Sequence, residues 1–125
     1  KRLLSLLMAH LVVKNFACGK SPLTAAEIGH ILGIPIRLVR QVLYEFVQSR
    51  IFSTVVLNDE QDLAYQPAGD ICKYSIGYVI NKLEKSGSNN IPVPETAALM
   101  TLKGTLHTFA RQIEKSPENK LLKDI

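Results

Sequence analysis

"LTAAEIGHILGIPIRLVRQVLYEF", residues 23–46, has the pattern of two short helices joined by a tight turn. Thr24 can cap the first helix, and Glu27, three residues later, can complete a capping box with it. Gly33 suits the left-handed position that ends a helix, and Pro35 suits the first turn of the next helix. The segment therefore predicts a helix-turn-helix.

The second helix, from Ile36 to Ser49, has an apolar and a polar face. The apolar residues, predicted to be buried, are Val39, Val42, Leu43, Phe46 and Val47. The polar residues, which a DNA groove would meet, are Arg37, Arg40, Gln41, Tyr44 and Gln48. An arginine there could pair with guanine and Gln41 with adenine, each good contact giving roughly 1–3 kcal/mol of discrimination. The alternative is that the arginines only keep an exposed helix face soluble.

The segments on either side predict a winged helix. An apolar repeat predicts a helix over residues 2–17 that is stopped by Gly19. The β-branched run "IFSTVVLNDEQDLAYQP", residues 51–67, predicts a hairpin with a polar tip, which is the wing. A further helix, capped by Ser75 and ended by Gly87, follows the hairpin.

The C-terminal residues predict a long helix outside this winged-helix domain. The fold class is therefore mainly α with a small β-hairpin: a winged helix-turn-helix over residues 1–87 and a helical extension over 88–125. The long helix, from about Pro94 to Lys115, has a narrow apolar seam typical of a coiled-coil contact. The seam consists of Leu99, Leu102, Leu106, Phe109 and Ile113. Because the pattern lasts only about two heptads, packing on the first helix and pairing in a homodimer both stay open.

The charge of the chain is unevenly distributed. The formal net charge is +4 and the sequence pI is about 9.2, which suits an anionic partner. Residues 51–72 contain no lysine or arginine and four acidic residues, so this segment is −4 and the rest of the chain +8. The acidic residues are Asp59, Glu60, Asp62 and Asp70. Because phosphates repel a wing of that sign, the charge disfavours duplex DNA as a partner, while binding by the helix alone stays open.

No pattern of catalytic or metal-binding residues is present in the sequence, so we expect no enzyme activity, cofactor or metal in this segment. Cys18 and Cys72 are far apart and lack metal-ligand spacing, which predicts buried free thiols in a reducing compartment. The apolar opening "KRLLSLLMAHLVV" is too short to span a membrane. We therefore expect a soluble fragment, cut from a longer protein.

Three stretches resemble the winged-helix C-terminal domain of some YihY/BrkB family inner-membrane proteins, labelled ribonuclease BN. They are "SPLTAAEIGHILGIPIRLVRQVLYEFVQSRIFSTVV", "LAYQPAGDICKYSIGYVINKLEKSG" and "SPENKLLKDI". The resemblance implies a parent membrane domain as a partner, and a position on the cytoplasmic side of the bacterial inner membrane. It carries over no nuclease residue, because no catalytic position matches.

The stretch "AYQPAGDICKYSIGYVINKLE" is also similar to iron–sulfur-binding repressors of the IscR type, which join a winged helix to a following helix. Those repressors take their cluster ligands from grouped cysteines, whereas this region contains Cys72 alone. The first hypothesis is a non-catalytic interaction and regulatory domain that dimerises or docks on its parent protein. The alternative is a DNA-binding transcriptional regulator that uses the helix-turn-helix at 24–49. A nuclease subdomain that only contacts RNA is a third.

Overall fold

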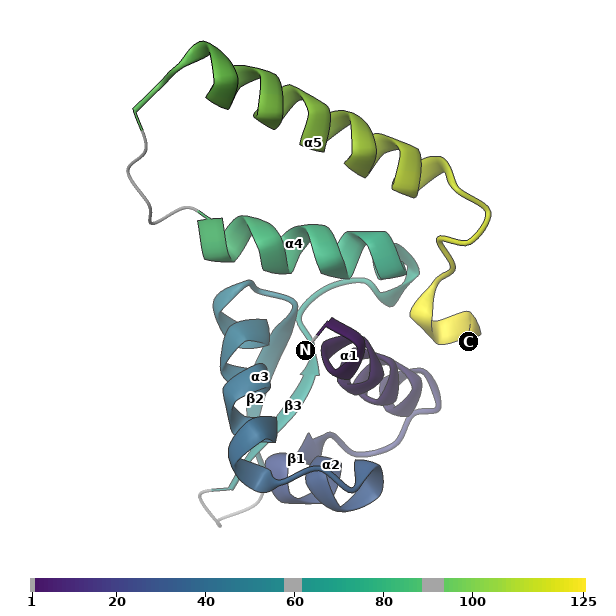
Figure 1. The fold of residues 1–125 in the computed structure, drawn as a ribbon. Coiled ribbons are helices and arrows are strands. Elements are labelled where there is room, and N and C mark those ends of the chain that lie inside the picture. Colours follow the sequence, from purple (N-terminus) through teal and green to yellow (C-terminus); the bar gives the residue numbers. More distant parts are fainter. Residues whose placement is uncertain (1, 58–61, 89–93) are drawn as a thin grey trace.

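The computed structural model of the chain describes residues 2–57, 62–88 and 94–125 (Figure 1). It confirms a mostly helical winged helix-turn-helix with a small antiparallel sheet. The helices are α1 (Arg2–Ala17), α2 (Ala25–Leu32), α3 (Ile36–Gln48), α4 (Ile76–Ser88) and α5 (Ala97–Lys115), with the short 3₁₀ helices η1 (Ile71–Lys73) and η2 (Leu122–Asp124). The strands are β1 (Leu23–Thr24), β2 (Phe52–Leu57) and β3 (Asp62–Pro67).

Local signals in the helix-turn-helix form as the sequence predicts. The Thr24 hydroxyl accepts a hydrogen bond from the Glu27 backbone N–H at 3.2 Å, and the Glu27 carboxylate accepts one from the Thr24 N–H at 3.1 Å. Gly33 ends α2 in the left-handed conformation, with φ of 67°. A Cβ at Gly29 would lie 2.9 Å from the carbonyl oxygen of Ile34, so only glycine fits this approach of α2 to the turn.

The sheet has the strand order β1-β3-β2. In the hairpin, Val55 pairs with Ala64 and Thr54 with Tyr65. The two-residue strand β1, with Leu23 opposite Tyr65, was not expected, because it is too short to show an alternating pattern. Most of the expected polar tip, residues 58–61, lies outside the described residues.

The core lies where α1, α2, α3, the sheet and α4 meet. Phe46 of α3 stacks on Phe52 of β2 with ring centroids 4.5 Å apart. The fully buried side chains include Met8, Val12, Val13, Ile28, Val39, Val42, Leu43, Phe46, Ile51 and Val79. In α1 the apolar repeat predicts one buried face, yet Leu7 and Phe16 on that face are exposed, while the small Ser5 and Ala9 are buried. The residues of the expected face are Leu4, Leu7, Met8, Leu11, Val12 and Phe16. This helix carries apolar side chains on all of its sides, so the spacing of the large apolar residues alone does not locate its buried face.

Helix α5 lies along α4, on the side away from the helix-turn-helix (Figure 1). The Ser75 hydroxyl caps α4 by accepting a hydrogen bond from the Tyr78 N–H at 3.1 Å, as expected. The helix ends at Ser88 rather than at Gly87, because helix ends are defined only to within a residue or two. Thr96 caps α5 by accepting from the Leu99 N–H at 3.1 Å.

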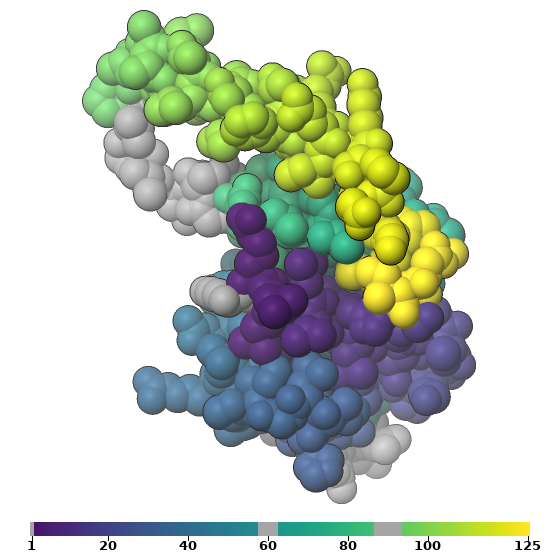
Figure 2. Space-filling model, turned by 45° about the vertical axis from the view of Figure 1, so that its right-hand side comes forward, coloured from purple at the N-terminus to yellow at the C-terminus, as the bar shows by residue number. Residues whose placement is uncertain are grey.

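The C-terminal tail returns from α5 to the winged helix, and its end lies against α1 (Figure 2). Leu121 forms an isolated β-bridge with Ser75, and the Leu122 N–H donates to the Tyr74 carbonyl at 2.9 Å. Leu122 itself is buried. On α1, the Lys14 ammonium donates to the Lys123 carbonyl at 2.9 Å. The tail therefore attaches the C-terminal end of α5 to the winged-helix domain.

Candidate nucleic-acid interface

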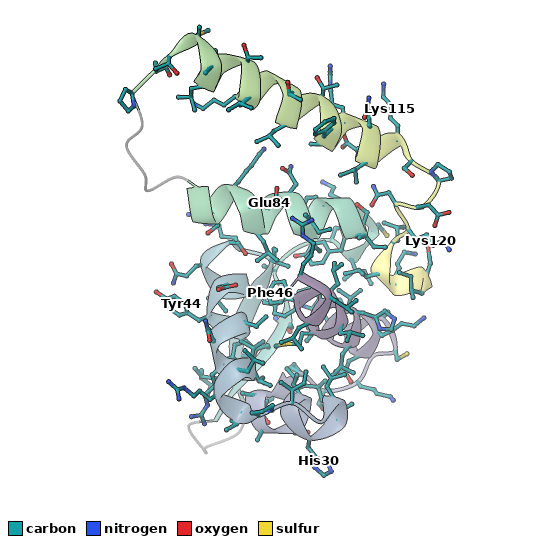
Figure 3. All side chains as sticks on the ribbon, viewed as in Figure 1. His30, Tyr44, Phe46, Glu84, Lys115 and Lys120 are labelled. Carbon is teal, nitrogen blue, oxygen red and sulfur yellow. The ribbon has the colours of Figure 1, made fainter. Side chains whose placement is uncertain are left out.

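The outer face of α3 carries all five residues that the sequence predicts for nucleic-acid contact. Each of Arg37, Arg40, Gln41, Tyr44 and Gln48 is exposed, with Tyr44 exposed by 66%. Tyr44 and Phe46 lie on opposite sides of the helix (Figure 3). Of the predicted stripe, Val39, Val42, Leu43 and Phe46 are buried and Val47 is half-buried. Contact of this face with nucleic acid stays a prediction.

A groove of about 680 Å³ runs beside α3, between this helix, the start of α2 and the sheet. Arg40, Tyr44 and Gln48 line it, whereas Arg37 and Gln41 do not. The groove separates the five predicted residues into two groups. The complete lining is Thr24, Ala25, Ala26, Arg40, Leu43, Tyr44, Val47, Gln48, Thr54, Leu63 and Tyr65.

The hairpin contributes hydroxyl groups that the sequence interpretation missed. Thr54 and Tyr65 are opposite each other in the register of β2 and β3 and both line the groove. Alternation along β2 places Thr54 and Val56 on one face, and both are exposed. This alternation was the available signal, but it does not show that the face lies beside α3.

The acidic residues of the wing region do not all have the same environment. Asp70 caps η1 by accepting a hydrogen bond from the Cys72 backbone N–H at 2.9 Å. This hydrogen bond lowers the pKa of the Asp70 carboxyl below its usual value, so its negative charge is tied to a structural role. Asp59 and Glu60 lie outside the described residues.

The predicted seam of α5 is largely uncovered. None of the residues of α5 is buried, and Leu102, Leu106 and Phe109 are exposed by 61%, 65% and 53%. Leu99 is half-buried. Ile113 approaches α4, since its Cγ2 lies 2.8 Å from the position that a Cβ of Gly77 would take. The seam therefore contacts α4 at Ile113 and does not pack on the first helix.

The expectation of buried thiols is wrong, because both cysteines are exposed. Cys18 follows the end of α1 and Cys72 lies in the single turn of η1, and neither short surface segment reaches the core. Within the described part of the chain, no three His, Cys, Asp or Glu side chains gather as a metal site would require. No helix among the described residues is both long and apolar enough to cross a bilayer.

Two solved structures have a similar fold. IscR of T. potens aligns with a TM-score of 0.57 and 10% sequence identity over 88% of this chain and 74% of that chain. A proposed transcriptional regulator from Listeria innocua aligns with a TM-score of 0.61 and 17% identity over 98% of this chain and 81% of that chain. No family model and no curated protein matches the chain. These structures give no support to the YihY/BrkB resemblance, and they show that the chain shares its fold with IscR and with the Listeria innocua protein.

Proposed function

We propose that this chain is a non-catalytic, DNA-binding transcriptional regulator that acts as a homodimer. The outer face of α3 is the observation that carries the proposal, because it presents two cations and three polar side chains on a helix that the core holds rigidly. The fold similarity to two regulators supports it. This function corresponds to the alternative that the sequence leaves open, in place of a domain docked on a membrane protein.

In this proposal α3 enters the major groove, where the N-terminal residues of a recognition helix meet base edges. Arg37 and Gln41 lie in the first half of the helix and are both exposed. An arginine can bond guanine and a glutamine can bond adenine through two hydrogen bonds each. Such contacts would give sequence specificity, while the acidic wing adds little phosphate attraction.

Dimerisation through the α5 seam supplies the second half of a DNA site. An apolar helix face that is exposed in the monomer is typical of a surface that binds a partner, because binding removes the apolar side chains from water. The seam spacing of three and four residues fits a second copy of the same helix, related by a twofold axis. Such a dimer would bind half-sites about one helical turn apart.

The DNA-binding part is tested with a library of fluorescent duplexes at low salt. We expect micromolar or tighter binding of a selected duplex that falls at least tenfold when Arg37 and Arg40 are both replaced by alanine. The matched control replaces Lys115 and Lys120 by alanine, which removes the same charge from positions away from Tyr44 (Figure 3). Equal losses in both double variants would contradict recognition by α3.

The dimer is tested by analytical ultracentrifugation. We expect Leu106→Glu to convert a dimer into a monomer, because it places a charge in the middle of the seam. Thr108→Glu is the control, since Thr108 is exposed on the opposite face of α5. A monomeric wild-type protein at high concentration would contradict the homodimer and favour the hypothesis that the seam docks on another protein.

A further inference from the structure

The groove between α3 and the sheet differs chemically from the wing tip. Among the described residues that line it, Arg40 is the only charged one, and none is acidic. Hydroxyl groups of Tyr44, Thr54 and Tyr65 come from the helix on one wall and the hairpin on the other. A concave surface with one cation and several hydroxyl donors suits an anionic chain with many oxygen acceptors.

The position of the groove restricts which part of a duplex it can meet. In B-DNA, one sugar–phosphate strand separates the major groove from the adjacent minor groove. In the proposed function α3 lies in the major groove, so a strand that borders this groove passes beside α3. The groove between α3 and the sheet runs along this side of the helix.

We infer that this groove holds one sugar–phosphate strand of the DNA, with Arg40 on a phosphate oxygen and the three hydroxyls donating to phosphate or sugar oxygens. Arg37 and Gln41, which do not line the groove, face the base edges. This inference rests on the proposed function and divides its residues into positioning and reading groups, which is the usual division of protein–DNA contacts.

The inference also changes the meaning of the acidic wing. Residues 51–72 are −4 by sequence, whereas Arg40 is the charged residue among the described residues that line the groove. None of these described lining residues carries the negative charge that repels phosphates. Phosphate attraction comes from α3, and the affinity should depend on salt only weakly, through few ionic contacts.

The test measures affinity against salt concentration for the selected duplex and for a scrambled duplex of equal length. Arg40→Ala should weaken binding to both duplexes by the same factor, about tenfold at low salt, and reduce the slope of log K against log salt by about 1. Arg40→Lys should restore the slope, because lysine also binds phosphate as a point charge. Gln41→Ala should leave the slope unchanged and relax the preference at one base pair.

A second variant tests the hydroxyl groups without removing charge. Tyr44→Phe combined with Tyr65→Phe should weaken binding to both duplexes equally, by a few-fold, with an unchanged salt slope. A change of base preference in Arg40→Ala, or a lost slope that Arg40→Lys does not restore, overturns the inference while DNA binding itself stands. Absence of wild-type binding to any duplex overturns the proposed function and the inference together.

Discussion

Helices α3 and α5 both have one apolar face, but their surroundings differ. In α3, Val39, Val42, Leu43 and Phe46 are all fully buried by the rest of the domain. In α5, no residue is buried along 19 residues, and the apolar residue Leu106 is 65% exposed. An amphipathic pattern therefore shows that a helix has a face to cover, but it does not show which molecule covers it.

The two ends of α5 explain the difference. At its C-terminal end, the Asn119 side chain accepts a hydrogen bond from the Gly77 N–H at 2.7 Å, and Leu122 is buried in the core. These contacts fix the tail on the winged helix. Further along α5 the seam residues Leu102 and Leu106 are exposed. Helix α5 packs on α4 rather than on the first helix, which was one of the two alternatives that the sequence left open.

The largest expected effect separates the two helices directly. Phe46→Ala removes a fully buried ring that stacks on Phe52, so unfolding should become easier by roughly 3–5 kcal/mol. Phe109→Ala, at a position 53% exposed, should change the stability of the monomer by no more than about 0.5 kcal/mol. Urea denaturation followed by circular dichroism at low protein concentration measures both.

If Phe109→Ala costs as much as Phe46→Ala at every protein concentration, α5 belongs to the core of its own domain and the comparison fails. If the cost of Phe109→Ala grows with concentration, the ring is buried in a dimer, since association stabilises the folded state by mass action.

The second prediction compares the stability effects of replacing a glycine in the helix-turn-helix and a glycine in α5. A Cβ at Gly29 would lie 2.9 Å from a backbone carbonyl, so Gly29→Ala should cost toward the upper end of roughly 1–3 kcal/mol. Nothing lies within 4 Å of a Cβ at Gly104, so Gly104→Ala should stabilise α5 by roughly 0.5–1 kcal/mol. Thermal unfolding should therefore show a lower Tm for Gly29→Ala and a higher Tm for Gly104→Ala than for the wild type. Stabilisation by Gly29→Ala would show that α2 can move away from the turn.

These contrasts also show what the sequence could predict. The capping box of Thr24 and Glu27, the left-handed Gly33 and the stripe of α3 are all local signals, and each forms as expected. Strand β1 and the groove residues Thr54 and Tyr65 depend on contacts between distant segments, such as Leu23 with Tyr65. Local periodicity contains no information about such contacts, so the sequence predicted the face of α3 but not the groove beside it.

A smaller effect should come from the residue that connects the two regions. The Tyr74 carbonyl accepts from the tail, and its hydroxyl donates to the Ile51 carbonyl at 2.7 Å and accepts from the Gly69 N–H at 3.0 Å. Tyr74→Phe leaves the Ile51 carbonyl and the Gly69 N–H without this partner and should cost about 1–2 kcal/mol. Urea denaturation at neutral pH measures the cost, and Tyr78→Phe is the control. An unchanged free energy of unfolding in Tyr74→Phe would mean that these two hydrogen bonds of the hydroxyl do not stabilise the fold.

The same hydroxyl predicts a loss of stability at alkaline pH. Burial raises the pKa of the Tyr74 phenol above its usual value, so the folded state keeps a proton that the unfolded state loses. The stability from this group is complete below the unfolded pKa of about 10 and decreases as the pH rises above it. Tyr74→Phe should therefore lose less stability than wild type between neutral pH and pH values above about 10. Parallel curves would contradict this assignment.

The smallest effect compares the C-terminal ends of α3 and α5. Arg50 has a φ of 61°, in the left-handed region, whereas Ser116 caps α5 with a φ of −70°. Arg50 is followed directly by the buried Ile51, whereas the backbone of Ser116 is in an ordinary conformation. Arg50→Gly should therefore stabilise the protein by about 0.5–1 kcal/mol, because glycine adopts this conformation without steric cost. Ser116→Gly should instead destabilise it slightly, since it adds freedom to the unfolded chain and removes the hydroxyl that accepts a hydrogen bond from the Glu118 N–H at 3.2 Å. Thermal unfolding of both variants measures these effects. Stabilisation by Ser116→Gly as well as by Arg50→Gly would contradict the explanation that the left-handed backbone of Arg50 causes the gain.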